Sequence, residues 1–249
     1  MNGVLFFSFV SVLAVCLVSL TGISILLMKQ EMLKRVLLFF VSLSAGALLG
    51  DAFIHLLPEA VEEGGFTLRV SLPIIASIIV FFLLEKFISW RHCHEPTSKE
   101  HPHTFGLMNM AGDLIHNFID GMVIAGSFFT SIPLGIQTTI AVVAHEIPQE
   151  MGDFGVLLYA GYSTRRAVFY NFLTALSAFA GMGATLYIGM RAHDFSTFIV
   201  PFAAGGFIYV ACSDLIPELH KETAITKSLA QLGGFLSGIA LMVALISLE

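Results

Sequence analysis

The sequence predicts an all-α polytopic membrane protein with eight transmembrane helices. Of its residues, 56% are hydrophobic and only 12% are charged, which is about half the charged fraction of an ordinary soluble domain. The mean hydropathy is +0.86, so too little polar surface is available to cover a water-soluble globule. The apolar residues form continuous runs and do not alternate with polar ones, which disfavours a membrane β-barrel. The net charge of −6 argues against a nucleic-acid partner.

Eight runs are long enough to cross the hydrocarbon core of a bilayer, which takes about 20 mostly apolar residues. They are 3–28, 36–57, 70–90, 105–130, 134–160, 167–190, 195–218 and 228–248. The first run has no charged residue and no basic segment before it, so we interpret it as a span and not as a cleaved signal peptide. We expect one transmembrane domain over residues 1–249, with a cytoplasmic loop at 91–104.

Lys and Arg predict how the chain is oriented. The loops and helix ends after spans one, three, five and seven hold ten of them, whereas the opposite side holds only Arg69 and Arg191. Because cytoplasmic loops are enriched in Lys and Arg, we expect both termini outside. The acidic loop around Glu59, Glu62 and Glu63 would then also lie outside, where it either attracts cations or is an ordinary solvated loop. The short loops favour the plasma membrane of a prokaryote, with an organelle membrane as the alternative.

Two span ends share a pattern that suggests an inverted repeat. Span two ends in His55-Leu-Leu-Pro-Glu59, and span seven ends in Asp214-Leu-Ile-Pro-Glu218. In the orientation above, these two ends lie on opposite sides of the membrane. This is expected if spans 1–3 and 6–8 are inverted copies around spans 4 and 5, as in many secondary transporters. The alternative is that both are ordinary proline-marked helix ends.

Spans four and five concentrate polar chemistry within apolar runs. Together they contain two imidazoles and five carboxylates: His116, His145, Asp113, Asp120, Glu146, Glu150 and Asp153. Each ionisable group at the bilayer centre costs about 3 kcal/mol on insertion scales. A bound cation would offset these costs, whereas interhelical hydrogen bonds are the alternative explanation for any single histidine.

The spacing of these residues fits metal binding. Residues four apart share a helix face, which pairs His116 with Asp120 and His145 with Gln149. Asn117 and Glu146 directly follow the two histidines, point about 100° away, and could line a second metal position. Nitrogen and oxygen ligands without thiolate favour Zn²⁺, Fe²⁺, Mn²⁺ or Cd²⁺.

A proline interrupts span five beside these residues. Pro148 has no backbone N–H and therefore frees the carbonyl of Ala144. Irregular backbone at membrane depth is tolerated where it is buried in protein or lines a cavity. We therefore expect the freed carbonyl to lie in such a place.

Two motifs carry a resemblance to a known family. His116-Asn-Phe-Ile-Asp-Gly121 and His145-Glu-Ile-Pro-Gln-Glu-Met-Gly-Asp153 resemble the paired signatures of the ZIP family of metal transporters, in the form of its LIV-1 branch. Asp51-Ala-Phe-Ile-His-Leu-Leu-Pro58 is similar to that branch as well. The resemblance extends over essentially the whole chain.

The resemblance implies a binuclear metal site. His116, Asp120, His145 and Gln149 would hold the first ion, and Asn117, Asp120, Glu146 and Gln149 the second. The chain departs from the family at Gln149, where many LIV-1 members carry His and other members Glu. Glu150 could substitute only if the kink at Pro148 turned it inward.

The resemblance also implies how the protein moves and associates. Spans one, four, five and six would move against two, three, seven and eight, and the chain would form a homodimer. Asp51, His55 and Asp113 would flank the transport pathway, unless they serve only as interhelical polar contacts.

Four of the nine histidines lie in or beside the loop expected at 91–104, namely His92, His94, His101 and His103. A His-rich tract can bind metal, although the spacing is not that of a zinc finger. We expect either a specific regulatory site or a flexible loop that binds metal weakly.

These observations predict a secondary transporter and not an enzyme. It would carry Zn²⁺, and also Cd²⁺, Fe²⁺ or Mn²⁺, into the cytoplasm, and no ATP-binding motif is found in the sequence. An intramembrane zinc metalloprotease is one alternative, but Gln149 stands where the HExxH motif needs its second histidine. A membrane metal sensor that uses the same ligands is the other.

Overall fold

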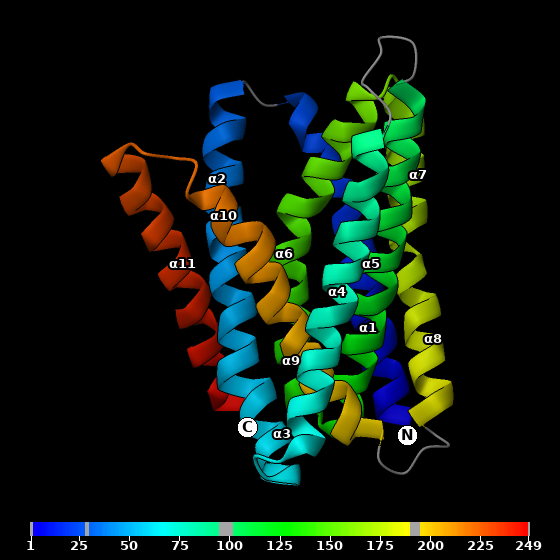
Figure 1. Ribbon diagram of the computed structural model, residues 1–249, viewed down its shortest axis with the longest axis vertical. Coiled ribbons are helices and arrows are strands. Elements are labelled where there is room, and N and C mark those ends of the chain that lie inside the picture. Colours follow the sequence, from blue (N-terminus) through cyan, green and yellow to red (C-terminus); the bar gives the residue numbers. More distant parts are fainter. Residues whose placement is uncertain (1, 28–29, 95–101, 190–194, 249) are drawn as a thin grey trace.

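The computed structural model describes residues 2–27, 30–94, 102–189 and 195–248, and this part of the chain contains helices and no strands. The all-α class predicted from the sequence is thus confirmed. The helices run roughly parallel to one long axis, and both chain ends lie at the same end of the bundle (Figure 1).

Eight helical segments follow one another along the described chain, one for each predicted span. In order they are α1 (Asn2–Val18) with η1 (Ser19–Leu27); α2 (Gln30–Gly50) with η2 (Asp51–Leu56) and α3 (Leu57–Gly64); α4 (Leu68–His94); α5 (Pro102–Thr130); α6 (Ile132–Tyr159); α7 (Thr164–Ala175) with α8 (Ser177–Gly189); α9 (Phe195–Val210) with η3 (Ala211–Leu215) and α10 (Ile216–Leu219); and α11 (Ile225–Leu245) with η4 (Ile246–Leu248).

The loop expected at 91–104 is shorter than the sequence suggests, because α4 continues to His94 and α5 begins at Pro102. His101 lies outside the described residues. The side chains of His92, His94 and His103 are also outside the description, so the expected metal-binding role of this loop stays a prediction.

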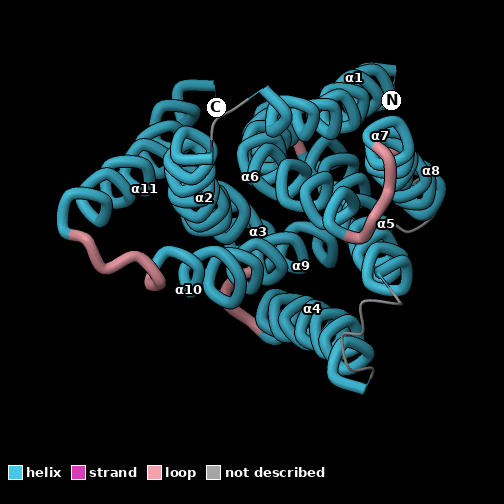
Figure 2. The backbone as a smooth tube through the Cα atoms, turned by 90° about the horizontal axis from the view of Figure 1, so that it is seen from above, coloured by secondary structure: helices cyan, strands magenta, loops and turns pink. Residues whose placement is uncertain are grey.

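Five segments among the described residues are long and apolar enough to cross a membrane. They are Gly3–Ser24, Leu38–Glu62, Leu68–Lys86, Thr164–Gly189 and Ile225–Leu245. The apolar part of α9, Thr197–Ser213, is shorter. Helices α5 and α6 are absent from this set. They carry the two imidazoles and five carboxylates that the sequence places in spans four and five. They pack against each other and against most other helices (Figure 2), and Asp113, Asp120, His145 and Glu146 on them are buried.

The contacts between helices repeat in a symmetric way. The contact between α2 and α11 corresponds to the contact between α9 and α4. In the same way, the contact between α5 and α8 corresponds to the contact of α6 with α1 and η1. These are the pairs that an inverted repeat of spans 1–3 and 6–8 around α5 and α6 would relate. The helices thus form two groups: α1, α5, α6, α7 and α8, and α2, α3, α4, α9, α10 and α11.

Two π-helical turns support the same relation. η2 precedes Pro58, and η3 precedes Pro217. A proline removes one hydrogen bond and crowds the carbonyl four residues earlier, so a locally widened turn relieves the clash. The two turns lie toward opposite ends of the bundle (Figure 1), as inverted copies should.

Glycines let α5 and α8 approach closely. A Cβ atom added at Gly121 would collide with the carbonyl of Ala178, and one added at Gly181 would collide with the carbonyl of Phe118. In contrast, a Cβ atom added at Gly183, two residues further along α8, would meet nothing within 4 Å. Small residues at such crossings are typical of membrane helix pairs.

We expect Gly181→Ala to destabilise the protein by about 1–3 kcal/mol, because the new methyl group forces α5 and α8 apart. Gly183→Ala is the matched control on the same helix and should be neutral or slightly stabilising, because alanine favours helix. Thermal unfolding of the purified protein in detergent measures both changes. Equal midpoints for the two variants would contradict the close approach.

Candidate metal centre

Local sequence signals place α5 and α6 so that their polar faces meet. The α6 helix begins after Ser131, whose side-chain oxygen accepts a hydrogen bond from the backbone N–H of Leu134 at 3.1 Å. This cap satisfies one of the N–H groups left free at a helix start. The tight turn between α5 and α6 makes the two helices antiparallel neighbours, so His116 and His145 lie at the same depth.

Pro148 lies within α6 and does not end it. The freed carbonyl of Ala144 accepts a hydrogen bond from Ser44 Oγ on α2 at 2.6 Å, and Ser44 is fully buried. The backbone irregularity predicted from Pro148 is therefore buried in protein and satisfied by a side chain. This hydrogen bond also joins the two helix groups.

Four side chains converge between α5 and α6: His116, Asp120, His145 and Glu146. One ligand atom from each lies within 4.8 Å of all the others. The two imidazole Nε2 atoms are 3.2 Å apart, and His116 Nε2 lies 3.3 Å from Glu146 Oε1 and 3.6 Å from Asp120 Oδ2. His145 Nε2 lies 3.2 Å from Asp120 Oδ2 and 3.4 Å from Glu146 Oε1.

These separations suit a tetrahedral ion. Ligands at about 2.0–2.1 Å from zinc in a tetrahedron are separated from one another by about 3.3–3.4 Å. The carboxylates and His145 are almost fully buried, and His116 is 17% exposed. The cluster therefore has the ligand types, the spacing and the shielding of a divalent metal site.

The polar atoms of this cluster lack other partners. Among the described residues, no hydrogen-bond partner satisfies Asp120 Oδ2 or either carboxylate oxygen of Glu146. A buried carboxylate oxygen without a donor is costly, and a bound cation would remove that cost.

The backbone orients one of the imidazoles. His145 Nδ1 lies 3.2 Å from the carbonyl of Ala141, four residues earlier on α6. A carbonyl only accepts, so Nδ1 donates this hydrogen bond, and in the neutral imidazole the lone pair of Nε2 then faces the cluster. Such an outer contact fixes the tautomer in many metal sites.

The structure places Glu146 differently from the sequence expectation. The helical rotation of about 100° suggests that Glu146 lines a separate second position. Instead, its Oε1 atom lies with the two histidines, because a glutamate side chain is long enough to reach around the helix. Asn117 is fully buried, and its Nδ2 atom donates to Asp113 Oδ1 at 2.7 Å.

The remaining predicted residues are dispersed around the cluster. Gln149 lines a cavity next to His116. Glu150 is fully buried and accepts a hydrogen bond from Asn171 on α7. His55 Nε2 lies 3.0 Å from the carbonyl of Met242, so it makes an interhelical contact of the kind considered above as the alternative to a pathway role. Asp51 is buried, and both its carboxylate oxygens lack a hydrogen-bond partner among the described residues.

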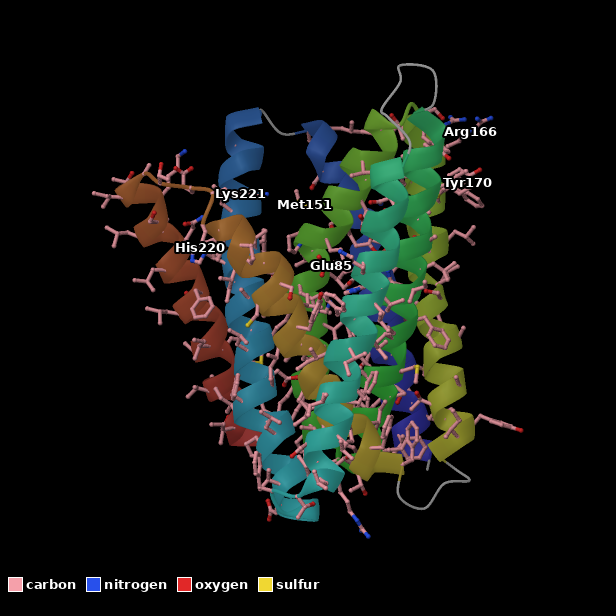
Figure 3. All side chains as sticks on the ribbon, viewed as in Figure 1. Glu85, Met151, Arg166, Tyr170, His220 and Lys221 are labelled. Carbon is pink, nitrogen blue, oxygen red and sulfur yellow. The ribbon has the colours of Figure 1, made fainter. Side chains whose placement is uncertain are left out.

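A cavity of about 250 Å³ extends from the cluster between α4, α5, α6 and α9. His116 lines it, together with the polar residues Glu85, Asn109, Asp113, Gln149, Asp153 and Tyr209. On α5 and α6 these polar residues lie toward the end of the bundle that carries Arg166, and Figure 3 shows Glu85 and Arg166 in that half. Because both termini lie at the other end, these polar residues lie between the cluster and the side expected to be cytoplasmic.

Several polar residues at the site were not predicted from the sequence. Asn109 donates to Asp153 Oδ1 at 2.9 Å at the cavity wall, and Tyr209 donates to Glu85. Asn171 and Thr174 of α7 contact the carboxylates of Glu150 and Asp113. The sequence offers only one signal for Asn171 and Thr174, which is that two uncharged polar residues lie three apart in an apolar span. Such a signal is too weak to assign a role.

Comparison with known proteins gives the same picture as the geometry. The family model described as ZIP Zinc transporter matches residues 5–106 and 91–246. The chain belongs to the ZIP family. It is 31% identical to Zinc transporter SLC39A7 of Mus musculus over 89% of its own length and 64% of that protein. It is 35% identical to Zinc transporter ZIP13 of Pongo abelii over 81% of its own length and 64% of that protein.

A third relative, Zinc transporter ZIP10 of Danio rerio, is 41% identical over 54% of the chain and 17% of that protein. These relatives belong to the LIV-1 branch, whose motif form the sequence shows. The chain spans about two thirds of the length of the first two relatives and less of the third.

We expect Zn²⁺ to raise the thermal midpoint of the purified protein. A ligand at 100 times its dissociation constant stabilises the folded state by about 2.7 kcal/mol, and excess chelator should reverse the shift. His145→Ala should abolish most of this stabilisation, whereas His220→Ala, at an exposed histidine directly after α10 (Figure 3), should retain it. An undiminished shift in His145→Ala would exclude the cluster as the zinc site.

Proposed function

We propose that this ZIP-family chain transports divalent transition-metal ions, chiefly Zn²⁺, across a membrane into the cytoplasm. One observation carries the proposal: two imidazole nitrogens and two carboxylate oxygens lie at tetrahedral ligand spacing, in the middle of a helical bundle, with their carboxylate oxygens otherwise unsatisfied. The relatives are named zinc transporters, which supports the same substrate. Cd²⁺, Fe²⁺ and Mn²⁺ suit the same ligands and are proposed as further substrates.

The cavity suggests the direction of release. His116 lines it, and carboxylates and amides line it toward one end of the bundle, so a divalent ion could leave His116 along a polar path. Moving a dication inward across about 100 mV, negative inside, releases about 4.6 kcal/mol, which is twice the value for a single charge. No ATP-driven step is needed for such downhill movement.

The opposite path is closed. Between the cluster and the end that carries the termini lie Asp51, His55, Gln137 and Thr138, all of them buried. Transport therefore requires that this side opens, and we propose that α1 and α5–α8 move together against α2–α4 and α9–α11. Ser44 and Gln137 make hydrogen bonds across this boundary, to the carbonyls of Ala144 and Leu245.

The site comprises, in this proposal, two adjoining metal positions. The cluster His116, Asp120, His145 and Glu146 is the first, and Asn117, Gln149 and Glu150 lie around it. Asp51, His55 and Asp113 flank the pathway. We further propose that the protein lies in a prokaryotic cytoplasmic membrane with both termini outside, and that it forms a homodimer. The loop histidines would also bind metal: His92, His94, His101 and His103.

The two alternatives are less well supported. A metalloprotease needs a second histidine four residues after His145, where the chain has Gln149, and the relatives are named transporters and not enzymes. A metal sensor would use the same cluster, but it would not need the cavity that connects the cluster to one side of the membrane.

The decisive experiment measures zinc flux. Purified protein in liposomes should move Zn²⁺ toward an entrapped fluorescent indicator, and His116→Ala or His145→Ala should remove most of this flux because each deletes one of the four ligands. Liposomes with His220→Ala serve as the matched control and should transport normally. If the protein bound zinc but gave no flux above that of protein-free liposomes, the transporter proposal would be rejected in favour of a metal sensor.

Replacing Gln149 tests the second metal position. A neutral amide is a weaker metal ligand than imidazole or carboxylate. We therefore expect Gln149→His and Gln149→Glu to bind more Zn²⁺ per chain than the native protein at the same free zinc concentration. Elemental analysis of dialysed protein measures the stoichiometry. An unchanged number of zinc ions per chain in both variants would show that position 149 does not contribute a metal ligand.

A further inference from the structure

A chain of buried hydrogen bonds connects α7 to one proposed ligand on α5. Thr174 Oγ1 donates to Asp113 Oδ2 at 2.5 Å, and Asn117 Nδ2 donates to Asp113 Oδ1 at 2.7 Å. Each of the three side chains is at most 5% exposed. Asp113 thus has both carboxylate oxygens engaged, one by each neighbour, and is fixed between α5 and α7.

The backbone determines which way the Asn117 amide faces. Its Nδ2 atom also donates to the main-chain carbonyl of Asp113 at 3.2 Å, and a carbonyl can only accept. Both neighbours of the amide nitrogen are therefore acceptors, and a flipped amide would place oxygen against oxygen. As a result Asn117 Oδ1 is left buried without a hydrogen-bond partner among the described residues.

Asn117 directly follows His116 in the chain and precedes Asp120 by three residues. Its buried Oδ1 atom, which has no hydrogen-bond partner among the described residues, is a suitable metal ligand. We propose that Thr174 and Asp113 are positioning residues, which hold the Asn117 amide so that its Oδ1 atom coordinates a metal ion beside the His116–Asp120–His145–Glu146 cluster. This inference rests on the proposed metal-binding function and adds the residues that set the ligand geometry. Asp113 acts through Asn117 and Thr174 acts through Asp113, and neither needs to touch the ion.

The position of Thr174 distinguishes this role from general helix packing. Three residues earlier on α7, Asn171 donates in the same way to the buried carboxylate of Glu150 on α6. One face of α7 therefore holds a carboxylate from each of the two metal-site helices. In contrast, Thr185 on α8 donates at 3.3 Å to the backbone carbonyl of Met122 on α5, which is not one of the proposed metal-site residues. Thr185 offers a buried threonine contact between the same two spans without the positioning role.

The test compares zinc affinity in the purified full chain. Thr174→Val removes the hydroxyl and keeps the shape, Thr174→Ser restores the hydroxyl, and Thr185→Val is the matched control. Loss of an outer contact in metal sites costs about 10–100-fold in affinity. We expect Thr174→Val to weaken Zn²⁺ binding by about tenfold, Thr174→Ser to bind like the native chain, and Thr185→Val to leave affinity unchanged although it removes an interhelical hydrogen bond.

A second background shows whether Thr174 acts through Asn117. In Asn117→Ala, the added Thr174→Val change should have no further effect on Zn²⁺ affinity, because the ligand that it orients is gone. A full tenfold loss in that background, or an Asn117→Ala chain that binds Zn²⁺ normally, would overturn the inference. The melting temperature of each variant without metal shows whether it is folded.

The outcomes also separate this inference from the proposed function. If the native chain binds no Zn²⁺, the metal-site proposal fails. If the native chain binds Zn²⁺ and both Thr174→Val and Thr185→Val bind it equally well, the site stands and only the positioning role is wrong.

Discussion

The rest of the structure depends on a local electrostatic imbalance between α5 and α6. One ligand atom from each of two carboxylates and two imidazoles lies within 4.8 Å of the others, and the inward-facing carboxylate oxygens have no hydrogen-bond partner outside the cluster among the described residues. Away from water such an arrangement is unfavourable unless a cation joins it. The surrounding helices keep these groups together and largely buried, so the energetic cost of holding them together becomes affinity for a dication.

The packing of the bundle serves this requirement. Glycines draw α5 against α8, and hydroxyl and amide side chains on α7 hold two carboxylates of the site-bearing helices. The more apolar helices surround this group and expose large hydrophobic side chains, as expected of a lipid-facing surface. The two site-bearing helices can therefore be too polar to satisfy a simple criterion for a membrane span and still lie at the centre of a membrane protein.

Much of this architecture follows from the sequence, because hydrophobic run length and charge placement are strong signals. All eight segments, the cluster helices and the carbonyl freed by Pro148 were predictable. The convergence of Glu146 with the histidines was not, because helical angles describe where a side chain starts and not how far a flexible carboxylate reaches. The contacts of Thr174, Asn171 and Ser44 were also not predictable, because uncharged hydroxyl and amide groups cost little in an apolar helix and leave no distinctive pattern.

The hydroxyl of Ser44 has two acceptors at the same distance. Its oxygen lies 2.6 Å from the carbonyl of Ala144 on α6 and 2.6 Å from the carbonyl of Phe40 on its own helix. If α6 slides along α2, Ser44 can rotate its proton to Phe40, so only the carbonyl of Ala144 loses a partner. The carbonyl freed by Pro148 therefore forms a hydrogen bond across the boundary between the helix groups that can be broken and re-formed, and breaking it costs on the order of 1 kcal/mol.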